Sequence, residues 1–169
     1  MRRTIALLPV TGAIACGSGP AAEPEAPTES VAGAPGTAGD VPVFQLDPAW
    51  PKPLPNNWTL GNVVGVAVDA RDDIWVIHRP GSLTAEEAGA AASPPLAECC
   101  RPAPAVIEFN QEGEVVQAWG GPGDGYEWPE AEHGIFIDHL DNVWIGGSGG
   151  NDAQILKFTQ GGDFLLQIG

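Results

Sequence analysis

Basic side chains are scarce in this sequence: its 169 residues include only 7 Lys and Arg, against 22 Asp and Glu, for a formal net charge of −15. Nucleic acids and anionic membrane surfaces are both bound by clustered lysines and arginines. The seven basic residues form no such patch. The composition therefore argues against nucleic acid and against an anionic lipid surface as partners.

Several enzyme motifs are also missing. The sequence has no nucleophile elbow and no paired-His zinc motif. Residues 120–125 are rich in glycine, but no helical pattern follows them to receive a phosphate group. We therefore interpret these residues as a connection between two structural units.

No apolar run reaches the roughly 20 residues that span a bilayer as a helix. Residues 4–15 are mostly apolar, follow two arginines and precede Cys16. A basic start, a short apolar core and small residues before a cleavage point indicate a signal peptide over residues 1–16. Residues 13–17 also resemble the bacterial lipoprotein signal, which implies an exported protein, periplasmic or at the cell surface, with its lipid anchor at Cys16. Cleavage without lipidation is the alternative.

A linker follows the signal peptide. Residues 17–39 consist, apart from Val31, of Gly, Ala, Ser, Thr, Pro and Glu. Such a segment buries too little apolar surface to offset the entropy lost on ordering, so residues 17–42 are predicted to be disordered. Residues 43–62 form a Pro-rich lead-in, in which residues 43–46 are predicted to form one short strand.

The remaining residues contain an internal repeat. Asp69 and Trp75 recur as Asp138 and Trp144, at an offset of 69 residues (138 − 69 = 69). Each Asp follows a short apolar run, and each Trp is the second residue of the next run after a polar turn. Repeats of this kind indicate one supersecondary unit used more than once.

A second pair of segments repeats with a shorter offset. Phe109 recurs as Phe158, 49 residues later (158 − 109 = 49), and each precedes a glycine turn typical of a β-hairpin. The difference between the two offsets places an insertion at residues 80–104. The repeat units are therefore residues 63–120 and residues 133–169, each with four short strands.

Units of four antiparallel strands arranged radially are the blades of a β-propeller, so the predicted fold is all-β, with two blades. Propellers have at least about four blades, which predicts that these residues are the front part of a longer protein. In a complete ring, the strand at residues 43–46 would close the last blade. A two-blade unit that assembles with copies of itself is the alternative.

Residues 60–169 resemble the NHL-type repeats of six-bladed propellers, through residues 66–69, 74–76, 134–144 and 155–158. Residues 66–79 and 132–138 further resemble the peptidyl-α-hydroxyglycine α-amidating lyase family. That family uses zinc to cleave a hydroxylated C-terminal glycine into a peptide amide and glyoxylate.

The resemblance to the lyase family implies particular site residues. His133 matches a zinc ligand, Arg79 matches a catalytic arginine that contacts substrate, and the backbone carbonyls of Val66 and Ile135 match ligands of a structural calcium. The family's other two histidine ligands, its catalytic tyrosine and a calcium-binding aspartate would lie beyond Gly169.

The residues themselves leave other interpretations open. His133 beside an acidic neighbour is compatible with a structural hydrogen bond, and Arg79 in so acidic a chain is compatible with an ion pair. We therefore favour a scaffold that binds a small molecule, a peptide or a protein at the channel face of the propeller. A zinc-dependent lyase is the alternative function.

The insertion carries its own signals. Thr84 and Glu87 have capping-box spacing before an Ala-rich stretch, which predicts a short helix. Cys99 and Cys100 are the only cysteines besides Cys16, and we expect either a disulfide between them or a bond from one of them to a cysteine outside these residues. The insertion leaves the strand that carries Arg79 and could cover the channel mouth as a lid.

Overall fold

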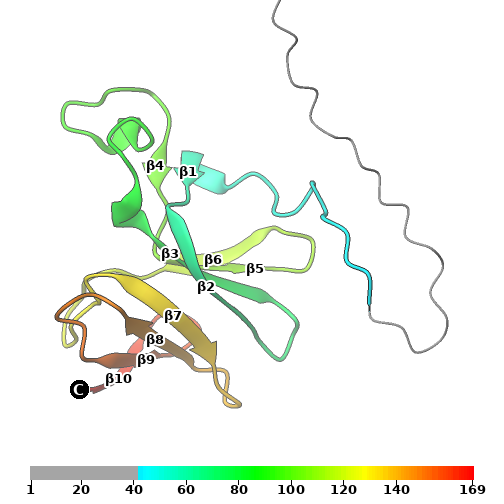
Figure 1. Cartoon of the computed structure of the whole chain (residues 1–169), viewed down its shortest axis with the longest axis vertical. Helices are drawn as coiled ribbons and strands as arrows, with labels where there is room; N and C mark the ends of the chain where they lie inside the picture. The colour runs from blue at the N-terminus through cyan, green and yellow to red at the C-terminus, as the bar shows by residue number, and fades with distance from the viewer. Residues whose placement is uncertain (1–41) are drawn as a thin grey trace, which may run out of the picture. The chain divides into compact units, whose positions relative to one another are not determined.

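The computed structural model describes residues 42–169, so the predicted signal peptide, the lipidation of Cys16 and the linker up to residue 41 lie outside the described residues. Residues 45–169 form one compact unit (Figure 1). No helix in the described part is long and apolar enough to cross a membrane.

The compact unit is built on two four-stranded antiparallel sheets, in each of which consecutive strands are neighbours (Figure 1). The first sheet contains β2 (Asn62–Val68), β3 (Ile74–Arg79), β5 (Val106–Phe109) and β6 (Val115–Trp119). The second sheet contains β7 (Glu132–Ile137), β8 (Val143–Gly147), β9 (Ile155–Phe158) and β10 (Phe164–Ile168). The predicted all-β class is thereby confirmed, and the arrangement is compatible with two propeller blades.

The smaller elements lie in the lead-in and the insertion. β1 (Trp58–Thr59) pairs in parallel with β4 (Arg101–Pro102), so the end of the insertion is bonded to the lead-in. Three short 3₁₀ helices complete the structure: η1 (Pro55–Asn57), η2 (Pro80–Ser82) and η3 (Gly89–Ala91). Residues 43–46, where the sequence predicts a strand, form none, and their apolar side chains are exposed.

The repeat has a clear structural counterpart in the turn after each inner strand. The indole Nε1 of Trp75 donates to Asp69 Oδ2 at 3.2 Å, and that of Trp144 donates to Asp138 Oδ2 at 2.9 Å. Backbone N–H groups of each turn donate to the same carboxylates. Each Asp therefore fixes its own turn and the first aromatic side chain of the following strand.

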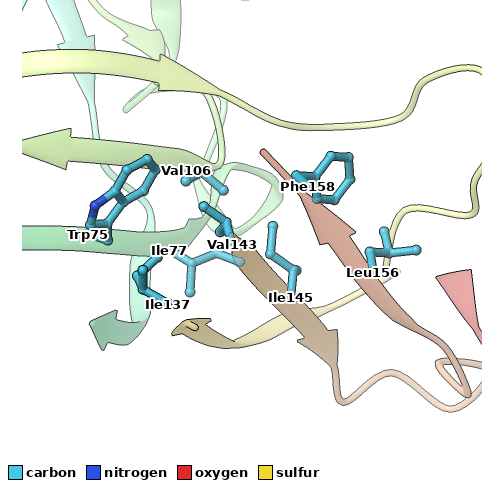
Figure 2. Close-up of a cluster of buried hydrophobic side chains, with 8 residues drawn as sticks. All are labelled: Trp75, Ile77, Val106, Ile137, Val143, Ile145, Leu156 and Phe158. Atoms are coloured by element: carbon cyan, nitrogen blue, oxygen red, sulfur yellow. The ribbon is translucent and has the colours of Figure 1, made fainter. Parts of the chain in front are cut away.

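The main core lies between the two sheets (Figure 2). We call the contacting side of the first sheet its leading face; its buried residues are Trp75, Ile77 and Val106. We call the contacting side of the second sheet its trailing face; its buried residues are Ile137, Val143, Ile145, Leu156 and Phe158. Leading face packs on trailing face, so the two sheets meet through different sides of the repeat.

A second core covers the trailing face of the first sheet. Its buried residues there are Val76, Ile107 and Phe109. The lead-in packs on them through Trp50, Leu54, Trp58 and Leu60. One of these contacts is aromatic: the ring centroids of Trp50 and Phe109 lie 5.5 Å apart. The lead-in thus covers the trailing face of the first sheet, just as the first sheet covers the trailing face of the second.

The short helix predicted in the insertion is reduced to one turn and the 3₁₀ helix η3, although its capping signal is real. Glu87 N–H donates to Thr84 Oγ1, and Thr84 N–H donates back to the Glu87 carboxylate at 2.8 Å. Only one turn and η3 follow, because the carbonyl of Gly89 accepts a hydrogen bond from Leu96 N–H instead of a helical partner. The insertion then returns through Cys99 and Cys100, which are joined to each other as a disulfide.

Candidate functional site

Arg79 lies at the end of β3, where the two sheets meet. Its Nε donates to the backbone carbonyl of Glu132 at 2.7 Å, and its Nη2 donates to Ser148 Oγ at 3.0 Å. Glu132 is the first residue of β7, Ser148 directly follows β8, and Ser148 is the repeat equivalent of Arg79 itself (148 − 79 = 69). Arg79 takes part in none of the ion pairs found in the described part of the chain, so its direct hydrogen-bond partners are neutral oxygens.

A cleft of about 620 Å³ opens beside this guanidinium. Small and apolar residues make up most of its wall, with Arg79, Ser82, Glu130 and Glu132 as its polar members. The apolar part comes mainly from Trp128, three prolines and Gly120 with Gly121. This size lies within the range of about 300–1,000 Å³ that is typical of small-molecule sites.

The acidic side of the cleft is only partly occupied by protein contacts. Glu132 is buried, and its Oε1 accepts a hydrogen bond from Trp128 Nε1 at 2.8 Å. Glu130 is exposed, and its Oε1 accepts from Asn151 at 3.0 Å. The cleft therefore presents one cationic group and two carboxylates around an apolar wall.

Asp152 holds the rim of the cleft in place. Its carboxylate accepts backbone N–H groups from Glu130 at 2.7 Å, Ala131 at 3.1 Å and Gly149 at 2.6 Å. Burial acts to raise the pKa of Asp152, but these backbone donors lower it below its ordinary value. The ionised carboxylate thus ties the glycine-rich loop after β8 to the segment before β7.

The other residues implied by the lyase resemblance do not line the cleft. His133 is exposed, directly after the residue whose carbonyl accepts from Arg79, but it does not line the cleft. Val66 is exposed on β2, and Ile135 is half-buried at the equivalent position of β7. The structure thus brings Arg79 to the start of β7 and leaves the zinc and calcium assignments as predictions.

His78 has a structural role. Its side chain is fully buried, its Nδ1 accepts from Gly61 N–H at 3.1 Å, and its Nε2 lies 2.9 Å from the carbonyl oxygen of Pro104. Because Nδ1 is an acceptor, the proton of the neutral ring sits on Nε2 and is donated to Pro104. Burial lowers the pKa of His78 below its ordinary value.

This burial predicts a loss of stability in mild acid. Protonation would remove the acceptor for Gly61 N–H, so the contribution of His78 is complete above pH 6.5 and is lost as the pH falls towards its lower folded-state pKa. The expected slope is at most about 1.4 kcal/mol per pH unit. Chemical unfolding followed between pH 6.5 and about pH 5 measures it. His78→Gln, which can make both hydrogen bonds without titrating, should flatten the slope, whereas the exposed His139→Gln should not.

Sequence reasoning missed an acidic cluster on the leading face of the first sheet, in which Asp69 and Glu108 are buried and Asp73 is half-buried. Asp69, Asp73 and Glu108 bring carboxylate oxygens within 4.8 Å of one another, and they are the one such group found in the described part of the chain that could hold a metal ion. Arg71 occupies the centre: its Nη2 lies 3.0 Å from Asp69 and 2.6 Å from Glu108, and its Nε lies 3.2 Å from Asp73. The arginine therefore does what a cation would do there.

The ionisation of this cluster is uneven. Burial raises the pKa of Glu108, and the neighbouring Asp69 and Asp73 act in the same direction against the hydrogen bond from Gln117 and the charge of Arg71. For Asp69, burial is outweighed by its hydrogen-bond donors, which lower its pKa. The signal in the sequence was the acidic residue between apolar neighbours in β5, because a buried strand carries a charge only where a partner is present.

No protein-family model matches the chain, and no curated protein matches it.

Proposed function

We propose that this chain belongs to an exported β-propeller of NHL type that acts as a binding scaffold, with the cleft beside Arg79 as its ligand site. The observation that carries the proposal is the pairing of Arg79: a half-buried guanidinium in a chain of net charge −15, bonded to a carbonyl and a hydroxyl but to no carboxylate. Its remaining N–H groups are available to an anionic ligand.

The rest of the cleft indicates an amphoteric ligand, such as an amino acid or a short peptide. A ligand carboxylate would take the free donors of Arg79 in a charge-assisted pair. A ligand ammonium would be attracted by the carboxylates of Glu130 and Glu132. Trp128 and the prolines would cover an apolar side chain, since aromatic walls with few polar groups are typical of small-molecule sites.

The proposal can be tested by isothermal titration with phenylalanine as the probe. Phenylalanine amide lacks the carboxylate and N-acetylphenylalanine lacks the ammonium, so both should bind more weakly than phenylalanine. Arg79→Gln should weaken phenylalanine about tenfold or more, which is the range expected for losing a hydrogen bond to a charged group. The same variant should leave the already weak amide almost unchanged.

Ser148→Ala is the matched control, because it removes one anchor of Arg79 and leaves the guanidinium in place. A smaller loss than that of Arg79→Gln is expected. Equal losses for phenylalanine and its amide in Arg79→Gln would show that the arginine only holds the two sheets together. If the parent chain does not bind phenylalanine, the proposal that the cleft binds an amphoteric ligand is wrong.

The zinc-dependent lyase remains the second proposal, favoured by one observation: Arg79 is bonded to the residue that precedes His133. The described residues contain no zinc centre around His133, and zinc sites need about four ligands, so further histidines would have to come from elsewhere. Repeating the titration with zinc present distinguishes the two proposals. A gain in affinity that disappears in His133→Ala would favour the lyase.

A further inference from the structure

The outer side of the second sheet is an open leading face. Ile155 is the repeat equivalent of Val106 (155 − 106 = 49), which is fully buried between the sheets, yet Ile155 is 47% exposed. Phe136 is the equivalent of Ala67 (136 − 67 = 69), which packs against the main core, yet Phe136 is 63% exposed. The second sheet thus repeats the apolar side that the first sheet buries, and nothing in the described chain covers it.

Gly134 on this open face is also the repeat equivalent of a covered residue, Gly65. In the first sheet, a Cβ on Gly65 would lie 2.9 Å from Ile77, 3.2 Å from the carbonyl oxygen of His133 and 3.2 Å from the nitrogen of Ile135. The backbone of β7 therefore rests directly on Gly65. Gly134 stands at the equivalent position (134 − 65 = 69), and a Cβ there would meet nothing within 4 Å. Gly134 therefore leaves space for the backbone of another strand, and no strand of the described chain occupies that space.

The matching surface is open on the first sheet. Ile137 is 9% exposed on the trailing face of the second sheet, but its equivalent Val68 is 55% exposed (137 − 68 = 69). Ile135 packs against the main core, but its equivalent Val66 is 59% exposed. The lead-in covers the part of this face formed by β3, β5 and β6 and leaves β2 open.

We propose that copies of this chain assemble head to tail, the open leading face of the second sheet in one copy receiving the trailing face of the first sheet in another. The contact would reproduce the interface that already joins the two sheets within the chain. It is heterologous, so it would generate rings or open chains and would not stop at a symmetric pair. The lead-in must move aside at the contact, since Trp50 and Leu54 lie over part of the receiving face.

A polar pair supports this register. Within the chain, Gln160 of the second sheet donates to Asp69 of the first at 3.2 Å, across the interface. Gln111 is the repeat equivalent of Gln160 (160 − 111 = 49), and Asp138 is the equivalent of Asp69. Within the chain, the side chain of Gln111 donates at 3.3 Å to the backbone carbonyl of Arg71. Gln111 and Asp138 each lie next to one of the two proposed contact faces. In the assembly, Gln111 of one copy would donate to Asp138 of the next.

Sedimentation velocity of the purified chain over a concentration series tests the proposal. The average mass should rise with concentration. Phe136→Asp, which blocks the leading face, and Val66→Asp, which blocks the trailing face, should each keep the chain monomeric. An equal mixture of the two variants should return to the mass of a dimer, because each retains the face that the other lacks.

Gly134→Val provides a variant that acts on the contact alone. The space above Gly134 is empty within the chain, so at a dilution that prevents association the unfolding midpoint of the variant should equal that of the parent. At higher concentration its association should be lost. Leu96→Asp, at an exposed apolar residue of the insertion, should change neither. A parent chain that stays monomeric, or variants that associate as the parent does, would overturn the proposal. A mixture that stays monomeric while the parent associates would overturn the head-to-tail arrangement.

Discussion

Phe158→Ala is expected to lower the free energy of unfolding by about 4 kcal/mol, the range measured when a large aromatic side chain is removed from a core. Phe158 is 1% exposed and belongs to the trailing face of the second sheet (Figure 2). Its ring contacts four others, with centroid distances of 5.2 Å to Trp119, 5.1 Å to Tyr126, 6.1 Å to Trp128 and 5.8 Å to Phe164.

The effect is large because this cluster joins three regions of the chain. Trp119 ends the first sheet, Tyr126 and Trp128 lie in the connection between the sheets, and Phe164 begins the last strand. Removing Phe158 leaves a cavity that these rings can fill only by moving the sheets relative to each other. Domains of this size are stable by about 5–15 kcal/mol, so the variant loses a large share of its stability.

Urea unfolding followed by tryptophan fluorescence measures this loss. Phe136→Ala is the matched control, because Phe136 is 63% exposed on the open side of the same sheet. Its expected change is within about 0.5 kcal/mol when measured at a dilution that prevents association. Similar losses for the two variants would mean that Phe158 does not contribute the contact between the sheets.

The parts of the fold that could be predicted from the sequence are those whose causes are local or repeated. Asp69 and Trp75 identify a turn because the carboxylate, the turn amides and the indole lie within seven residues of chain, and the recurrence of this turn at Asp138 confirms it. The alternation in β9 follows from the two faces of a strand, with Leu156 and Phe158 buried between the sheets and Ile155 exposed on the other face. These signals need no knowledge of distant contacts.

The parts that could not be predicted depend on residues far apart in the chain. Arg71 reaches Glu108, and Gln160 reaches Asp69 from the other sheet. The cleft depends on the same kind of contact, since the acceptors of Arg79 lie at residues 132 and 148. The insertion forms only a turn and η3, because Leu96 N–H donates to the carbonyl of Gly89. Sequence periodicity predicts none of these pairings.

The Asp of the repeated turn pairs with a cation in both sheets, but the cation comes from a different position in each. In the first sheet, the residue at the central β5 position is Glu108, and Arg71 lies between it and Asp69. In the second sheet, the equivalent of Glu108 is Lys157 (157 − 108 = 49), which lies 3.1 Å from Asp138. Leu140 replaces the arginine there. The cation therefore lies in the turn in the first sheet and in the strand in the second, while the Asp and the Trp occupy the same positions in both.

Asp69→Ala should therefore be the most damaging change at a polar residue, with an expected loss of about 3 kcal/mol, because it leaves buried partners unsatisfied. The side chain accepts from the buried Trp75 at 3.2 Å, from backbone N–H groups of Arg71 at 2.8 Å and Asp73 at 3.1 Å, and from Gln160 of the second sheet. It also forms an ion pair with Arg71, which in turn pairs with the buried Glu108.

Two matched variants distinguish the causes of that loss, each measured by urea unfolding. Asp69→Asn keeps an acceptor for the turn and loses the charge, so it should retain part of the stability. Asp138→Ala removes the same turn acceptor from the second sheet, where Trp144 is only half-buried and water can replace the lost bonds, so its loss should be smaller. Equal losses at Asp69 and Asp138 would show that the turn itself, and not the buried charge cluster, determines the cost.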